Sequence, residues 1–255
     1  MRNKKLFNSK EIMDSPIVPE WGKAVFSDFS QDMLSEENPF PCILGVEGLK
    51  KDLLRFAFVS SPYNYKDIRL CADALKEYMS CFRTLGRYTS FVVFFEPEHK
   101  KRTMTQYETM FWDTLTFLHR IDGKPWPEEI PKNPNDPLWE FCFEGEPIFV
   151  VCNTPVHELR KSRKSSSFII TFQPRWVFEG MTPHTKMGQQ VQKTVRNRLE
   201  DYDKVEAHPH LGWYGDQENH EWKQYFLRDV NNSFPTECPF KLKRSERDGV
   251  KKSLY

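Results

Sequence analysis

The sequence lacks the short motifs that mark many familiar enzyme classes. Its 255 residues contain no glycine-rich phosphate loop, no G-x-S-x-G elbow and no H-E-x-x-H segment. These motifs build a phosphate cradle, a serine nucleophile and a zinc site, respectively. P-loop nucleotide hydrolases, α/β-hydrolases and zincin-type metalloproteases are therefore not expected.

Long apolar runs and paired cysteines are also absent. The apolar stretch 91–95 is far too short to span a bilayer, and residues 1–11 hold no apolar run of signal-peptide length. Without an export signal or a C-x-x-C spacing, the cysteines are predicted to be reduced thiols. We expect a cytoplasmic protein that does not enter the membrane. The six cysteines are Cys42, Cys71, Cys81, Cys142, Cys152 and Cys238.

The chain has no excess of charge of either sign. Its 37 basic and 36 acidic residues nearly cancel, so nothing in the overall charge predicts a nucleic-acid partner. Aromatic residues are abundant, at 15% with 21 Phe and 7 Trp. They can line a flat apolar ligand site, but composition alone favours the simpler explanation of a phenylalanine-rich core.

Hydrophobic periodicity predicts one α+β domain with a mixed, mostly antiparallel sheet flanked by helices. We divide the chain into an N-terminal arm (1–37), this domain (38–240) and a charged tail (241–255). A loop over 208–226 is rich in His, Gly and Trp, as functional loops often are. The expected helices are 65–85, 104–118 and 185–202; the expected strands are 88–96 and 167–172, with hairpins formed by 42–47 with 53–60 and by 139–143 with 147–153.

Cys42 is the most distinctive cysteine of the chain. Pro39 and Pro41 fix the backbone on either side of Phe40, and Gly45 follows three residues after the cysteine. A thiol on such a stiff segment suits a metal ligand, which needs a fixed position and N–H groups directed at sulfur. It also suits an inert buried thiol or, with a histidine in reach, a nucleophile.

Several arginines lie in or next to apolar strands and are expected to pair with carboxylates. Arg55 interrupts an apolar run, and Arg175 follows one directly. Arg160 and Arg163 follow the strand that contains Cys152. The partner carboxylate of such an arginine is a structural Asp or Glu, a haem propionate or a substrate acid.

Seven blocks of the sequence together resemble the YqcI/YcgG family of bacterial proteins, over about residues 40–240. The blocks are Phe40-Pro41-Cys42, Leu54-Arg55-Phe56, 91–95, 136–143, 147–151, 167–176 and 222–225.

The resemblance implies a haem-dependent monooxygenase that N-hydroxylates a guanidine or another small nitrogenous substrate. It implies haem b, dioxygen as co-substrate and an electron-donating reductase. Cys42 then becomes the axial ligand of the haem iron, and Arg55 a propionate or structural partner. Arg175, Trp176 and Tyr225 are further candidates for the haem pocket. Characterised hydroxylases of the family tend to carry His-Pro where this chain has Thr154-Pro155.

A guanidinium substrate requires a carboxylate that faces it with two oxygens. Glu140, Glu179 and Asp216 lie in or beside the shared blocks and are the candidates. Two other functions fit the same sequence: a haem-binding or haem-sensing protein without catalysis, and a cofactor-free interaction protein.

Overall fold

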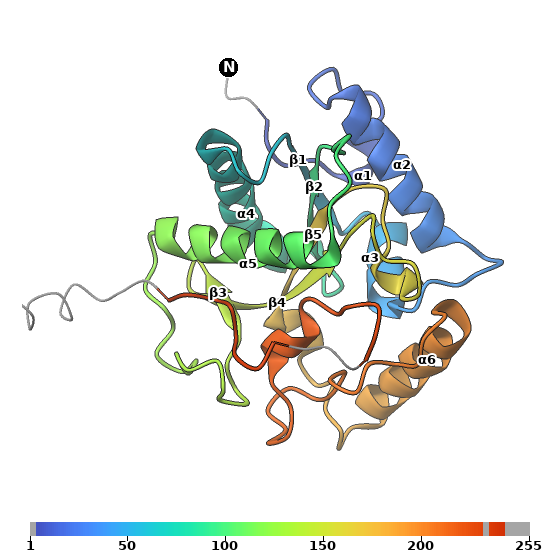
Figure 1. Ribbon diagram of the computed structural model, residues 1–255, viewed down its shortest axis with the longest axis vertical. Helices are drawn as coiled ribbons and strands as arrows, with labels where there is room; N and C mark the ends of the chain where they lie inside the picture. The colour runs from blue at the N-terminus through green and yellow to red at the C-terminus, as the bar shows by residue number, and fades with distance from the viewer. Residues whose placement is uncertain (1–3, 232–234, 243–255) are drawn as a thin grey trace, which may run out of the picture.

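The computed structural model describes residues 4–231 and 235–242, and its centre is a five-stranded sheet in the order β1-β2-β5-β4-β3 (Figure 1). β1 and β2 are parallel, and the other three pairs are antiparallel. The predicted α+β class with a mostly antiparallel sheet is confirmed. The strands are β1 (Arg55–Val59), β2 (Phe91–Phe95), β3 (Phe141–Phe143), β4 (Glu146–Asn153) and β5 (Ile169–Pro174).

Helices cover both faces of the sheet, because strand side chains alternate between the two faces. On one face, α4 (Tyr65–Leu85) and α5 (Met104–Ile121) pack on a large core that includes Phe91, Val93 and Phe95. On the other face, α1 (Ser9–Ile12) and α2 (Glu20–Leu34) pack on a second core that includes Val92 and Phe94. Figure 1 shows α4 and α2 on opposite sides of the strands.

The helices predicted over 65–85, 104–118 and 185–202 are confirmed, although α5 ends three residues later than predicted, at Ile121. Asn64 caps the first turn of α4 through its side chain, and Gly86 ends the helix with a φ of 131°. Thr103 and Gln106 form a capping box at the start of α5. The 139–153 hairpin is also confirmed, as β3 and β4, and it turns through Glu144 and Gly145 with φ values of 53° and 77°.

The predicted hairpin of 42–47 with 53–60 is wrong in its first half. Residues Ile43–Lys50 form a helix, α3, whose N-cap is Cys42. Leu44, Gly45, Gly48 and Leu49 are buried, a helical spacing that a short apolar run does not distinguish from a strand. Close packing favours the helix, because a Cβ at Gly48 would lie 2.1 Å from the Tyr88 carbonyl oxygen.

The N-terminal segment is part of the packed structure. α2 contributes Val25, Phe26 and Met33 to the second core. Most of the charged tail predicted for 241–255 lies outside the described residues. None of the helices in the described ranges combines the length and the hydropathy needed to cross a membrane.

Candidate functional site

A cavity of about 380 Å³ lies against the half of the sheet that α1 and α2 leave uncovered. Its floor is formed by alternate residues of β4 and β5, whose other residues face the core under α4 and α5. α3 and the end of α2 form one wall. The floor residues are Phe149, Val151, Asn153, Ile169, Thr171 and Gln173.

Helix α6 (Lys186–Tyr202) covers this cavity with its apolar side. Val191, Val195 and Leu199 recur at helical spacing and line the cavity, while most of the remaining side chains of α6 are exposed. Figure 1 shows α6 on the far side of α3 from α2. The apolar stripe of this helix therefore faces the cavity, and Val191 also packs on a small cluster formed by Leu44, Val177 and Met181.

Cys42 lies at the N-terminus of α3 and lines the cavity as an exposed side chain. Its Sγ accepts a hydrogen bond from the Gly45 backbone N–H at 3.4 Å. The surrounding protein raises the pKa of the Cys42 thiol by desolvation, and the Gly45 N–H and the Arg163 charge oppose that rise. Cys42 thus presents a thiol to the cavity on a fixed backbone.

Arg175 joins two buried carboxylates at another part of the cavity wall. Its Nε and Nη2 donate to the two oxygens of Glu140 at 2.8 Å and 2.6 Å, and Nη2 also donates to Glu221. Glu140 is fully buried, and the Glu221 side chain is 3% exposed. The Tyr214 ring lies over the guanidinium, 3.8 Å from its central carbon. Arg175, Tyr214 and Glu221 line the cavity, whereas Glu140 is held behind them.

The two carboxylates share a single cationic partner within the described chain. Burial raises the pKa of the Glu140 carboxyl to about 8 against the attraction of Arg175, and the Glu221 carboxylate adds to the rise. Burial likewise raises the pKa of Glu221. This cluster can therefore take up a proton or a second cation.

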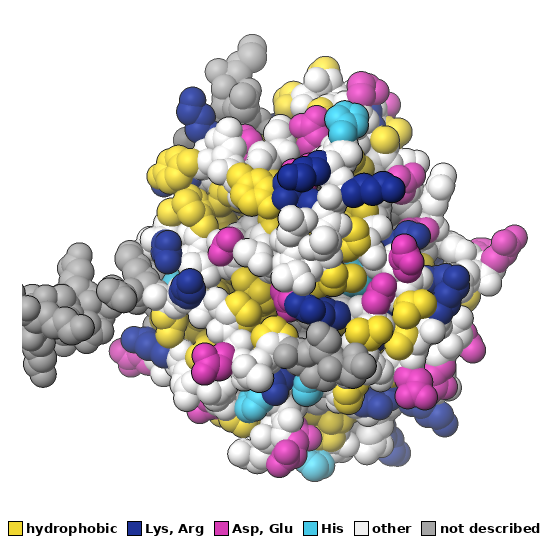
Figure 2. Space-filling model, in the orientation of Figure 1, with side chains coloured by type: hydrophobic (Ala, Val, Ile, Leu, Met, Phe, Trp, Pro, Cys, Tyr) yellow, Lys and Arg dark blue, Asp and Glu magenta, His cyan; other side chains and the backbone are white. Residues whose placement is uncertain are grey.

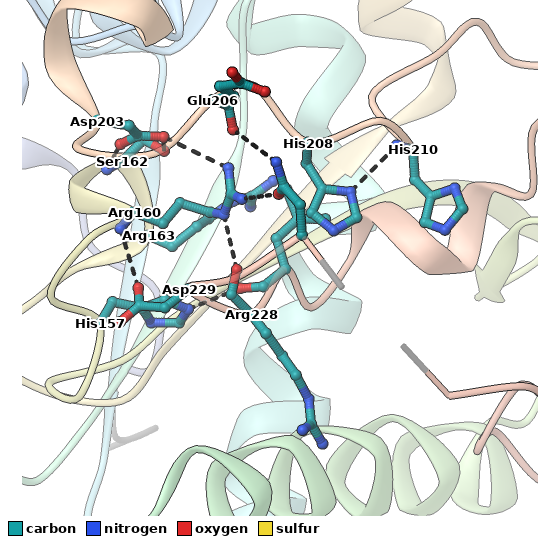
Figure 3. A network of polar contacts seen from close by, with 12 residues as sticks. His157, Arg160, Ser162, Arg163, Asp203, Glu206, His208, His210, Arg228 and Asp229 are labelled. Carbon is teal, nitrogen blue, oxygen red and sulfur yellow. Dashed lines mark hydrogen bonds and ion pairs between the residues drawn. The ribbon is translucent and has the colours of Figure 1, made fainter. Parts of the chain in front are cut away.

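A second polar cluster surrounds Arg160 and holds its guanidinium within the protein (Figure 3). Arg160 Nε donates to the Arg228 carbonyl oxygen at 2.9 Å, and Nη2 donates to Asn231 Oδ1 at 2.6 Å. Its Nη1 lies 3.7 Å from an Asp203 oxygen. Asp203 in turn accepts hydrogen bonds from the backbone and hydroxyl of Ser162. Arg160 therefore has a structural role.

The predicted site residues are brought together only in part. Cys42 and Arg175 line the cavity, and Glu140 is bound to Arg175. The other five candidates do not line it. Arg55 donates to the Asp52 and Leu54 carbonyl oxygens, Trp176 packs on Phe82, Tyr225 is fully buried, and Glu179 and Asp216 are exposed.

Glu221 and Arg163 are two of the charged cavity-lining residues that were not among the predicted site residues. Glu221 directly precedes the shared block 222–225 and lies within the loop 208–226 that the sequence marks as functional. Arg163 was recognised only as an arginine beside the Cys152 strand. Neither position has a local pattern that distinguishes a cavity from a surface, so the sequence alone left both unassigned.

The fold and the site together define an α+β protein with a cavity that is lined by a thiol and by buried charges. The chain belongs to the YqcI/YcgG family, whose model matches residues 29–241. It is 44% identical to YqcI and 42% identical to YcgG of Bacillus subtilis (strain 168), each over 226 residues that cover 88% of this chain and 89% of the relative.

A third relative has a name that describes an activity. The chain is 31% identical over 244 residues to the "Putative N(omega)-hydroxy-L-arginine synthase DcsA" of Streptomyces lavendulae, which covers 93% of this chain and 90% of that protein. No solved structure shows a significant match to the chain.

Proposed function

We propose that this protein is a haem-dependent monooxygenase that N-hydroxylates a guanidine-containing or similar small nitrogenous substrate. The observation that carries the proposal is the position of the Cys42 thiol. It lies at the N-terminus of α3 and lines a cavity of ligand size. The name of the relative DcsA supports the reaction class, because an N(omega)-hydroxy-arginine synthase adds oxygen to a guanidine nitrogen.

The residues that line the cavity fit a haem b group. The cavity has a floor of three apolar and three polar residues and an apolar lid from α6, and Cys42 would supply the sulfur ligand of such a group. Bound haem with a thiolate ligand would use dioxygen and two electrons from a reductase, and the thiolate favours O–O cleavage. A ligand role for Cys42 would also explain why prolines fix the backbone that precedes it.

Two groups beside Cys42 favour negative charge on its sulfur and oppose the desolvation that raises its pKa. The Gly45 N–H points at the sulfur, and Arg163 and the N-terminus of α3 supply positive potential nearby. Since a metal-bound thiol is deprotonated, these groups would stabilise the ligated form more than the free thiol.

Glu221 is the carboxylate that we assign to the substrate guanidinium. Glu221 lines the cavity, and Arg175 contacts one side of its carboxylate. The single charge of Arg175 does not neutralise both carboxylates of the cluster. A second guanidinium would restore charge balance through a hydrogen-bonded pair with Glu221. Glu140 acts through Arg175 as a positioning residue. Glu179 and Asp216, which are exposed, have no part in this proposal.

An absorption spectrum of the ferrous–CO protein, expressed with haem supplementation, tests the cofactor and its ligand. A thiolate ligand should give a strongly red-shifted Soret band that Cys42→Ala loses. Cys81→Ala is the matched control, because Cys81 is a partly buried cysteine that does not line the cavity. An unchanged spectrum in Cys42→Ala would refute the ligand assignment.

Turnover separates an oxygenase from its two alternatives. Oxygen consumption and N-hydroxylated product are measured with L-arginine and related guanidines in the presence of a reductase. A haem-loaded protein that turns over none of them would be a haem-binding or haem-sensing protein. Colourless protein from haem-replete cells would instead support a cofactor-free interaction protein.

A further inference from the structure

Arg163 differs from Arg160, the other buried arginine of its segment, because it forms no ion pair with a carboxylate of the described residues. It lies at the end of the short helix η1 (Lys161–Arg163) and is 8% exposed. No carboxylate in the described chain lies within 4 Å of its guanidinium. Its one side-chain hydrogen bond runs from Nη2 to the Gln224 carbonyl oxygen at 3.3 Å.

The unused donors of Arg163 face the cavity. Arg163 lines the cavity, and its Nε and Nη1 are not among the fully buried polar atoms that lack a partner. Arg160 also lines the cavity, but its Nη1 is fully buried without a hydrogen-bond partner among the described residues and lies 3.7 Å from an Asp203 oxygen (Figure 3). The guanidinium of Arg163 therefore offers two N–H groups to whatever fills the cavity.

A buried cation without a counter-charge is costly, and proteins usually pair it. Burial and the charge of Arg160 lower the pKa of Arg163 to about 10, which still leaves it protonated at neutral pH. Asp203 attracts the Arg163 charge from beyond ion-pair distance. A carboxylate in the cavity would give the guanidinium a directly bonded counter-charge.

We propose that Arg163 is a carboxylate-binding site of this cavity. A planar guanidinium with two free N–H groups matches a carboxylate in geometry as well as in charge. The carboxylate has two sources, a haem propionate or the carboxylate of an amino-acid substrate. The choice of these probes rests on the proposed function, whereas the site itself rests on Arg163.

Ligand-free stability tests the site without any haem. Arg163→Met keeps the buried stem and removes the charge, so the ligand-free variant should melt at a higher temperature than the wild type. Arg160→Met should melt at a lower temperature, because it breaks an internal hydrogen-bond network. Equal or lower stability of ligand-free Arg163→Met would count against an uncompensated charge.

Two binding experiments identify the source of the carboxylate. The apoprotein is titrated with haemin and with haemin dimethyl ester, which lacks the two charged carboxylates. The isolated protein is titrated calorimetrically with L-arginine and with agmatine, its decarboxylated analogue. In one of the two pairs, the wild type should bind the ligand with the free carboxylate (haemin or L-arginine) about ten- to a hundredfold more tightly than its analogue. Arg163→Met should lose that preference. Arg163→Lys should retain part of it.

Arg196→Met is the matched control, because Arg196 lines the same cavity but is exposed to solvent. The proposal is overturned if the wild type shows no preference for the carboxylate-bearing ligand in either pair, or if Arg163→Met keeps every preference that the wild type shows. It is also overturned if Arg196→Met loses as much of the preference as Arg163→Met does. Failure of the wild type to bind haemin at all would refute the proposed function instead. The L-arginine and agmatine pair, together with the melting temperatures, would then decide the role of Arg163.

Discussion

Gly45 donates its backbone N–H to the Cys42 sulfur across 3.4 Å, and a Cβ built on Gly45 would lie only 3.2 Å from that sulfur. The same Cβ would lie 3.2 Å from the terminal methyl group of Met33. Glycine at position 45 thus provides both the hydrogen bond and the space that set the position of the thiol.

Gly45→Ala should therefore disturb the sulfur more than the fold. Alanine stabilises a helix interior by about 1 kcal/mol relative to glycine, which offsets part of the crowding cost. The flexible Met33 side chain can also move. We expect a melting temperature close to that of the wild type, together with a shifted ferrous–CO Soret band and weaker haem binding.

Gly48→Ala is the control for this substitution within the same helix. Its Cβ would meet the Tyr88 carbonyl oxygen at 2.1 Å, and backbone cannot move as a side chain does. A loss of about 3 kcal/mol in the free energy of unfolding is expected. If Gly45→Ala leaves the haem spectrum and the haem affinity unchanged, haem binding does not depend on the position of the Cys42 sulfur.

The Glu140–Arg175–Glu221 cluster should make stability depend on pH. The pKa of Glu140 is raised in the folded protein from 4.5 to about 8, so its contribution is fully present below pH 4.5 and is lost as the pH rises towards 8. The loss is at most about 1.4 kcal/mol per pH unit. Urea unfolding at several pH values measures it in the ligand-free protein.

Glu221→Gln should flatten this dependence. The substitution removes the second carboxylate, so Glu140 can ionise against Arg175 without repulsion. The free energy of unfolding should then fall less between pH 5 and 8 than in the wild type. Parallel pH profiles for the two proteins would show that Glu221 carries no uncompensated charge.

Tyr225 should prove structural, although the sequence suggested a place in the haem pocket. Its hydroxyl accepts a hydrogen bond from the Phe141 N–H and donates one to the Ile148 carbonyl oxygen, each at 3.1 Å, and the ring is fully buried. Tyr225→Phe should cost about 1–3 kcal/mol in the free energy of unfolding because both groups lose a buried partner. The haem spectrum should not change.

Tyr214→Phe provides the comparison, because the Tyr214 hydroxyl also donates to a backbone carbonyl, that of Leu138. Tyr214 is only partly buried, so water can replace the hydrogen bond at lower cost. A change in the haem spectrum of Tyr225→Phe, with unaltered stability, would instead indicate that Tyr225 contacts the ligand.

The sequence predicts the parts of this fold whose signals are local. The α4 helix has a cap, a periodic apolar face and a terminal glycine within one segment, and β2 is continuously apolar. The eight residues of α3 show no such contrast, because the run is too short to separate helix from strand. Its conformation depends on packing against Tyr88, which lies 40 residues from Gly48 in the sequence.

The candidate site shows the same division. The Pro-Phe-Pro-Cys segment identified Cys42, because the residues that constrain its backbone are its neighbours in the sequence. Arg175 and its two carboxylates are separated by 35 and 46 positions, so only the folded chain reveals that they share a charge. Distance in sequence, more than residue type, decided which parts of the site could be predicted.

The apolar side of α6 should matter more for ligand binding than for folding. Val195 is partly buried and faces the cavity, whereas Val150 of β4 is fully buried in the core. Val→Thr conserves shape and adds a hydroxyl, and threonine is close to valine in helix propensity. Val150→Thr should therefore cost about 1–3 kcal/mol in the free energy of unfolding.

Val195→Thr should lower the free energy of unfolding by less than roughly 1 kcal/mol, because its hydroxyl can hydrogen-bond to water in the ligand-free cavity. Haem binding should nevertheless weaken several-fold, since the bound group would displace that water and leave the hydroxyl without a partner. Chemical unfolding of the apoprotein and a haemin titration measure the two quantities in the same samples. If Val195→Thr destabilises the apoprotein as much as Val150→Thr does, α6 is part of the packed core; if it leaves haem affinity unchanged, α6 does not cover the ligand.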